Sequence, residues 1–259
     1  LCRRNIDVAN AEAPAPRVRA IYPRSPVVPE NLLRFYVYFT EPMAEGDFLE
    51  HIQLRDLDSG EVLTGVFFDN LYELWTPDRK RITLLVDPGR VKTGLDANQR
   101  FGRAFVAGHR YGLDVLPTWK SISGVPLGEG YTHCFRATSE DRERIKPNEW
   151  TLELPETGTI DGVTVQFHKT VDHVSVGQFL RVLDNQQRPV PGRWLLSPAD
   201  DEVTFVPTTP WRGTIEEYVL EVALRFEDVV GNNVNASFDH TATDSVRSPG
   251  SKVVYRAFR

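Results

Sequence analysis

The sequence predicts an all-β protein made of two tandem β-sandwiches that are joined by a short charged linker. Three observations predict this fold class. Apolar residues alternate with polar ones at a period of two, turn-forming sequences separate the short alternating runs, and the second half of the chain repeats the first.

The alternation is clearest at Tyr111, Leu113 and Val115, where every second residue is apolar. Such a run gives a strand one apolar face, which packs on a core. Glycine- and proline-containing turns separate these runs, at about the spacing of a seven-stranded sandwich. We expect no helix of ten or more residues, and one helical turn within 90–105. The turns are Asp58-Ser-Gly60, Asp87-Pro-Gly89, Ser123-Gly124, Pro191-Gly192 and Gly231-Asn-Asn233.

An internal repeat organises the chain. The segment Tyr111-Gly-Leu-Asp-Val115 matches Tyr218-Val-Leu-Glu-Val222 at a lag of 107, and the same lag relates Trp119 to Phe226. Several such matches in one order indicate duplication of a whole unit. The remaining matches are Gly124 with Gly231, Leu127 with Val234, Phe35–Phe39 with Gly162–Phe167, Met43 with Val171, Phe48 with Phe179, Arg81–Leu84 with Glu202–Phe205, and Cys134-Phe135 with Ser237-Phe238.

We therefore divide the chain into a tether at 1–16, a first sandwich at 17–146 and a second at 147–259. The first sandwich includes the linker 138–146, which is charged and poor in apolar residues. It carries 18 basic and 18 acidic residues, whereas the second carries 10 and 16. The net charge of −6 thus belongs to the second sandwich.

Composition excludes several classes of protein. Apolar residues make up 41% of the chain and charged residues 25%, which indicates a globular protein with a core. The apolar runs are too short for a membrane span. The net charge of −6 argues against nucleic acid as a partner. No motif for a cofactor is present, so none is expected.

Cys2 is a candidate for lipidation, because it precedes a tether that ends in Ala-Pro-Ala-Pro. A membrane contact is expected only through such an anchor. The alternatives are a free thiol or a disulfide with Cys134, the second of the two cysteines.

The segment Val37-Tyr-Phe-Thr-Glu-Pro-Met43 resembles the strand and turn of the bacterial Ig-like domains of the S-layer-protein type. Trp75-Thr-Pro-Asp78 with Ile82-Thr-Leu-Leu85, and Tyr218-Val-Leu-Glu-Val222 with Glu227-Asp-Val-Val-Gly-Asn232, extend the resemblance over both repeats. Two departures stand out, at His168-Lys-Thr-Val171 and at Ser121-Ile-Ser-Gly-Val125. The resemblance implies immunoglobulin-like sandwiches in an extracytoplasmic, bacterial, non-enzymatic protein.

Recognisable catalytic motifs are absent, so we predict that the protein is not an enzyme. His133 and Cys134 are neighbours on a strand and point to opposite faces, which predicts a partly buried, inert thiol. His168, Asp172 and His173 are residue types that can bracket a metal ion, but their spacing favours a solvated loop.

Two acidic loops are weak candidates for calcium. Asp56–Glu61 begins like a calcium loop but lacks the distal glutamate. The second loop offers Glu227, Asp228 and Asn232, and turn capping explains it without an ion.

The leading hypothesis is a structural or adaptor protein that contacts other protein subunits of a cell-envelope or extracellular assembly. The β-prone final segment carries the contact candidates Val253, Val254, Tyr255 and Phe258. Trp211, beside Pro210, is expected to be an exposed binding aromatic residue. The alternative is a module of a cell-surface protein that binds glycan or calcium.

Overall fold

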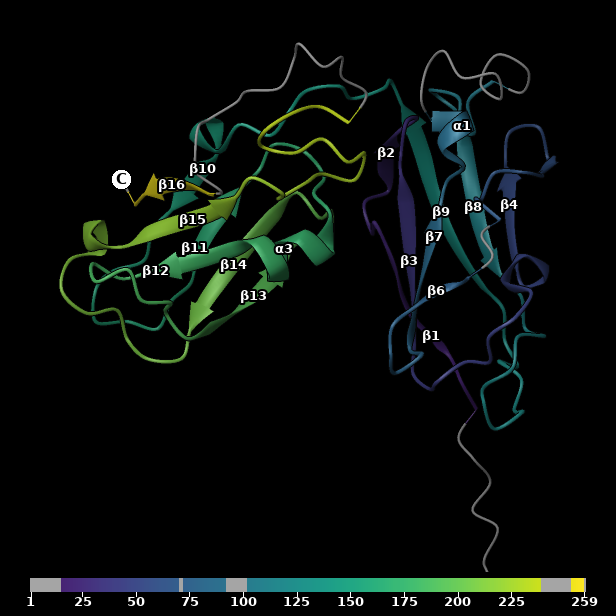
Figure 1. Cartoon of the computed structure of the whole chain (residues 1–259), viewed down its shortest axis with the longest axis horizontal. Helices are drawn as coiled ribbons and strands as arrows, with labels where there is room; N and C mark the ends of the chain where they lie inside the picture. The colour runs from purple at the N-terminus through teal and green to yellow at the C-terminus, as the bar shows by residue number, and fades with distance from the viewer. Residues whose placement is uncertain (1–14, 70–71, 92–101, 239–252, 259) are drawn as a thin grey trace, which may run out of the picture.

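The computed structural model describes residues 15–69, 72–91, 102–238 and 253–258. Two β-sandwiches lie side by side, and the N-terminal one is on the right of Figure 1. Each consists of two sheets, so the predicted all-β fold class with two sandwiches is confirmed.

The N-terminal sandwich packs a four-stranded sheet against a five-stranded one. Its strands are antiparallel except for the parallel pair β2–β9. In spatial order the first sheet is β1 (Val18–Tyr22), β3 (Arg34–Phe39), β7 (Arg81–Leu85) and β6 (Leu74–Trp75). The second sheet is β2 (Val27–Pro29), β9 (Tyr131–Thr138), β8 (Arg110–Val115), β4 (Ile52–Asp56) and β5 (Val62–Leu63).

The C-terminal sandwich repeats this plan with fewer strands. Its first sheet is β10 (Thr151–Glu153), β11 (Val163–Gln166), β14 (Glu202–Pro207) and β13 (Gly192–Leu196). Its second sheet is β12 (Leu180–Leu183), β15 (Val219–Ala223) and β16 (Val253–Ala257). Strand β16 therefore ends a sheet.

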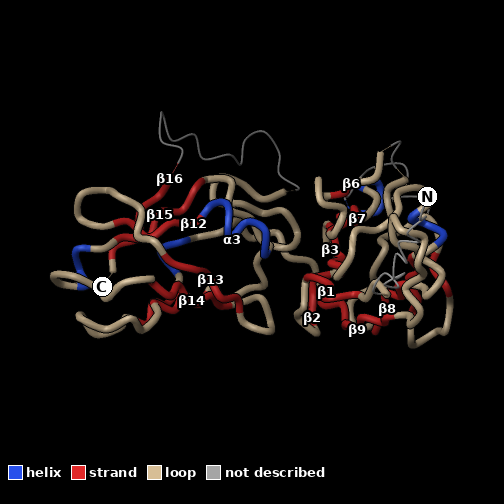
Figure 2. The backbone as a smooth tube through the Cα atoms, turned by 90° about the horizontal axis from the view of Figure 1, so that it is seen from below, coloured by secondary structure: helices blue, strands red, loops and turns tan. Residues whose placement is uncertain are grey.

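The helices of the described residues are short, as the sequence predicts. The longest of them is α3 (His173–Phe179), which Figure 2 shows on the side of the C-terminal sandwich that faces the N-terminal one. The expected helical turn within 90–105 rests on residues 94–100, which lie outside the described residues, and α1 reaches that range only with Arg90 and Val91. The other short helices of the described ranges are η1 (Phe48–Glu50), α1 (Pro88–Val91), η2 (Pro147–Glu149) and η3 (Ile215–Glu217).

Isolated bridges mark equivalent places in the two sandwiches. Met43 pairs with Ser121 in the first, and Val171 pairs with Asp228 in the second. The bridges Lys120–Pro126 and Glu227–Asn233 are related by the same lag of 107 residues. The loops 120–126 and 227–233 are therefore structural counterparts.

A tyrosine locks the same corner of each sandwich. The hydroxyl of Tyr111 accepts a hydrogen bond from the backbone N–H of Val106 at 2.8 Å, and that of Tyr218 accepts one from Arg212 at 2.9 Å. Such a tyrosine corner at the start of a strand is typical of immunoglobulin-like sandwiches.

One match of the sequence repeat is wrong. Cys134-Phe135 corresponds to Ala257-Phe258 rather than to Ser237-Phe238, because Phe135 pairs with Tyr111 and Phe258 donates its N–H to the carbonyl of Tyr218. Phe238 instead packs against the core of the N-terminal sandwich. Equivalent residues are those that pair with equivalent strands, and similarity of residue types does not show which strands pair.

Candidate functional site

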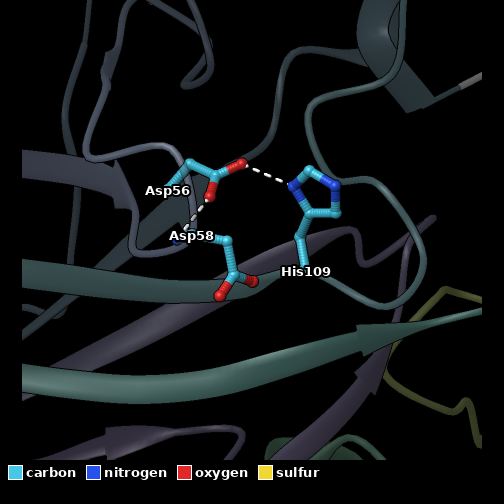
Figure 3. Close-up of side chains that lie close together, drawn as sticks. All are labelled: Asp56, Asp58 and His109. Carbon is cyan, nitrogen blue, oxygen red and sulfur yellow. Dashed lines mark hydrogen bonds and ion pairs between the residues drawn. The ribbon is translucent and has the colours of Figure 1, made fainter.

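The part of the chain that the structure describes contains one group of side chains with metal-ligating atoms close together, namely Asp56, Asp58 and His109. Figure 3 shows the carboxylate of Asp56 directed at the His109 ring, while that of Asp58 turns away. Asp56 Oδ2 lies 2.7 Å from His109 Nδ1, and Oδ1 accepts the N–H of Asp58 and Ser59.

These groups are already paired with protein atoms. Arg110 donates to Asp58 from its backbone and its guanidinium, at 2.7–2.9 Å. Burial works to raise the pKa of Asp56, but the hydrogen bonds from His109 and two backbone amides outweigh it and lower the pKa. The cluster fastens the turn after β4 to the start of β8, and this fastening explains it without an ion.

The loop with the calcium candidates Glu227, Asp228 and Asn232 is occupied in the same way. Asp228 is fully buried, and its Oδ1 accepts the backbone N–H of Val230 and Asn232 at 3.0 and 2.9 Å. Its Oδ2 lies 2.7 Å from the Lys169 ammonium and accepts from the Asn232 amide. Burial raises the pKa of Asp228 to about 6, and Lys169 opposes the shift. The ammonium of Lys169 therefore supplies the positive charge that a bound cation would otherwise supply to Asp228.

The same loop joins the two sandwiches. Val229 and Val230 are buried in the hydrophobic core of the N-terminal sandwich, although they belong to the C-terminal one. The backbone carbonyl of Val229 accepts the N–H of Leu33 at 3.1 Å, and Glu227 forms an ion pair with Arg34. We call residues 227–233 the wedge loop.

The tip of α3 makes a second contact between the sandwiches. Asp172 caps the helix by accepting the Ser175 N–H at 2.9 Å, and it also accepts the Tyr36 hydroxyl at 2.7 Å. The ring of His173 stacks on Tyr22 at a centroid distance of 3.8 Å, and its Nε2 lies 2.7 Å from the Tyr38 hydroxyl. Burial lowers the pKa of His173 to about 4.

Asp200 completes the interface. Its buried carboxylate receives the backbone N–H, Nε and Nη2 of Arg24, and the guanidinium also donates to the carbonyls of Leu196 and Ser197. Burial raises the pKa of Asp200 to about 6 although Arg24 opposes it. Burying this carboxylate without a cation would cost several kcal/mol, at about the scale known for unpaired charges. The pairing of Asp200 with Arg24 therefore stabilises the arrangement in which the two sandwiches are docked.

This geometry corrects the expectation of a solvated loop at Asp172 and His173, whereas His168 is exposed as expected. Asp172 is buried and His173 is half-buried, because both face the N-terminal sandwich. His168 lies apart from them, with its Nε2 3.0 Å from the Thr151 hydroxyl. The sequence signal for this interface was the departure of copy two from copy one at 168–171.

Other candidate residues fall in different environments. Trp211 is buried, contrary to the expected exposure, because it packs on Tyr218 and donates its indole N–H to the Asp161 carbonyl at 2.8 Å. Cys134 is exposed rather than partly buried, while Phe135 is in the core as expected. Cys2 lies outside the described residues.

Among the final-strand candidates, Phe258 is fully buried in the C-terminal core and cannot present its side chain to a partner. Val253 and Val254 are partly buried, and Tyr255 is 51% exposed. Only Tyr255 of these four therefore offers a largely exposed side chain.

No helix within the described ranges has the length and apolar character that a membrane crossing requires. No protein-family model matches the sequence, and no curated protein matches it. Two solved structures of Escherichia coli alpha-2-macroglobulin are similar at 13% identity and a TM-score of 0.30, over 80% of this chain.

One of these is a crystal structure spanning domains MG0-NIE-MG1, of which the similarity covers 65%. The other is a cryo-EM reconstruction of the native conformation, of which it covers 13%. A TM-score of this size carries no functional argument.

Proposed function

We propose that this chain is a non-enzymatic structural or adaptor subunit that holds two immunoglobulin-like sandwiches in one fixed arrangement and contacts partner proteins. The observation that carries the proposal is the shared packing of the two sandwiches. Val229 and Val230 complete a core that belongs to the other sandwich, and buried carboxylates pair across the interface. A chain whose halves worked as independent beads would not need these contacts.

The contact with a partner is made through the free side of β16. This strand ends the sheet β12–β15–β16, and among the described strands none pairs with its outer side. Phe258 donates its N–H to Tyr218. Backbone hydrogen bonding alternates from residue to residue along an antiparallel pair. The N–H groups of Val254 and Arg256 therefore also point toward β15, while those of Tyr255 and Ala257 point away from it. An extended partner segment can add to such an edge.

The location and the family belong to the same proposal. The resemblance of Val37–Met43 to S-layer-type Ig-like domains supports an extracytoplasmic, bacterial protein of the cell envelope. Cys2 is its proposed lipid anchor, and other protein subunits are its proposed partners. The net charge of −6 supports protein rather than nucleic acid as the partner.

The test compares two variants of one residue. Tyr255→Pro removes the outward N–H of β16 but no bond to β15, whereas Tyr255→Ala removes only the side chain. We expect the native mass of the complex recovered from the source cells to fall to that of the free chain in Tyr255→Pro, and to change little in Tyr255→Ala.

Circular dichroism of each purified variant checks that the fold is kept. If the folded Tyr255→Pro protein is recovered in the wild-type complex, β16 is not the contact. If the wild-type chain itself is recovered alone, the subunit proposal fails.

A further inference from the structure

The free edge beside β6 differs from the corresponding edge of the other sandwich. Phe67 pairs with Val86 and Leu74 pairs with Thr83, so this edge uses seven residues where β7 uses three. We call the described residues of this stretch, Phe68, Asp69, Tyr72 and Glu73, the bulge. The counterpart strand β13 pairs with β14 without interruption over five residues. The bulge is thus an addition to the repeated framework, and it blocks this edge against strand pairing.

The bulge and helix η1 enclose an acidic hollow of about 340 Å³. Five carboxylates line it, and no lysine or arginine does. They are Glu45, Asp47, Glu50, Asp69 and Glu73. The N-terminal sandwich has equal numbers of basic and acidic residues, so this concentration is local and does not reflect the net charge.

Two of these carboxylates are engaged within the protein. Glu73 accepts the Phe48 N–H at 2.9 Å and the Trp75 indole N–H at 2.5 Å, which fastens the bulge to η1. Glu45 forms an exposed ion pair with Arg79. Asp47, Glu50 and Asp69 are exposed, and no ion pair joins them to a described cation. Because the donors to Glu73 are neutral, only Glu45 of the five is paired with a described cation, and four negative charges remain unbalanced around one hollow.

Exposed apolar side chains border the same hollow. Tyr72 is 71% exposed, and Leu49, Phe68 and Leu74 are each exposed to about 40%. Phe68, Tyr72 and Leu74 line a shallow depression next to the acidic hollow, and the two share Phe48 and Glu73. Apolar side chains gathered beside a charged hollow are typical of a protein contact surface.

We infer that this surface binds a basic segment of a partner protein, with lysine or arginine side chains in the hollow and apolar neighbours on Phe68, Tyr72 and Leu74. Charge complementarity selects this occupant. A metal ion is a poorer fit than an extended basic segment, because no three of these carboxylates bring their oxygens within 4.8 Å of one another among the described residues. This site is independent of β16, so the molecule would hold two partners at a fixed separation.

The experiment uses the whole chain and two fluorescent ten-residue peptides, one alternating Lys with Leu and one alternating Glu with Leu. The test variant is Asp47→Asn/Glu50→Gln/Asp69→Asn, where Asn suits the left-handed backbone of Asp47. Its matched control, Glu129→Gln/Glu156→Gln/Asp161→Asn, removes the same charge from three other exposed positions.

Fluorescence anisotropy should show that the Lys peptide binds wild type and control alike and binds the test variant about tenfold more weakly, the scale of several exposed charge pairs together. Tyr72→Ser should weaken binding while all carboxylates remain. Hydrogen exchange of the free variants checks that their fold is kept. The inference is overturned if the Lys peptide does not bind wild type, if the Glu peptide binds equally well, or if the control loses as much affinity as the test variant.

Discussion

The loop that follows the second sheet's central strand has opposite environments in the two sandwiches. In the N-terminal sandwich it is loop 120–126, where Ile122 is 63% exposed. In the C-terminal sandwich it is the wedge loop, where Val229 occupies the same position and is 5% exposed. The strands around the two loops are arranged alike, so the difference lies in the loops. Loop 120–126 is largely exposed, whereas the wedge loop packs on the other sandwich.

The largest expected effect comes from placing a charge at these two positions. Val229→Asp puts an unpaired carboxylate into the N-terminal core, so we expect the free energy of unfolding to fall by about 3 kcal/mol or more. Ile122→Asp, the matched control, should change it by less than about 0.5 kcal/mol. Urea unfolding measures both values. Equal losses in the two variants would mean that the wedge loop does not dock.

A second comparison uses two residues at equivalent turns, both with positive φ. Asp200 is buried and holds Arg24 across the interface, whereas Arg79 holds Glu45 at the surface. Asp200→Asn leaves the Arg24 guanidinium without its anion, which should cost about 2 kcal/mol, since Arg24 is partly exposed. Glu45→Gln should cost at most about 1 kcal/mol.

The same denaturation experiment gives both numbers. Small-angle scattering adds a second measurement, because Asp200→Asn should also increase the radius of gyration if the docking loosens. A loss from Glu45→Gln that equals the loss from Asp200→Asn would contradict the distinction between a docked and a free turn.

The smallest effect concerns pH. The pKa of His173 falls to about 4 in the docked protein, so its contribution to stability is present above its ordinary pKa of 6.5 and is lost as the pH falls through 4. The pKa of Asp200 rises to about 6, so its contribution has the opposite sign, present below 3.8 and lost as the pH rises through 6. In the wild type the two oppose each other between pH 4 and 6.

His173→Gln removes only the first contribution. Relative to wild type, the free energy of unfolding of this variant should rise as the pH is lowered from 6.5 to 4, which urea titrations at several pH values will measure. His51→Gln, at a half-buried ring outside the interface between the sandwiches, is the control. A difference from wild type that does not change with pH would show that His173 is not buried at the interface.

Much of the fold could be predicted from sequence because strands encode it locally. The alternation at Tyr111–Val115 and its repeat at Tyr218–Val222 predicted two strands that the structure contains, and the lag of 107 predicted which loops correspond. The candidate sites were harder to predict. Trp211 and Phe258 looked available for contact, yet both fill the C-terminal core.

The sequence by itself determined the class of fold, the duplication and the faces of the strands, since a period of two is a property of neighbouring residues. Only the tertiary structure decided which surfaces are covered. The wedge loop, the tip of α3 and Asp200 meet partners more than 130 residues away, at Arg34, Tyr36 and Arg24. Burial of that kind depends on how two finished sandwiches fit together, and no local pattern along the chain records it.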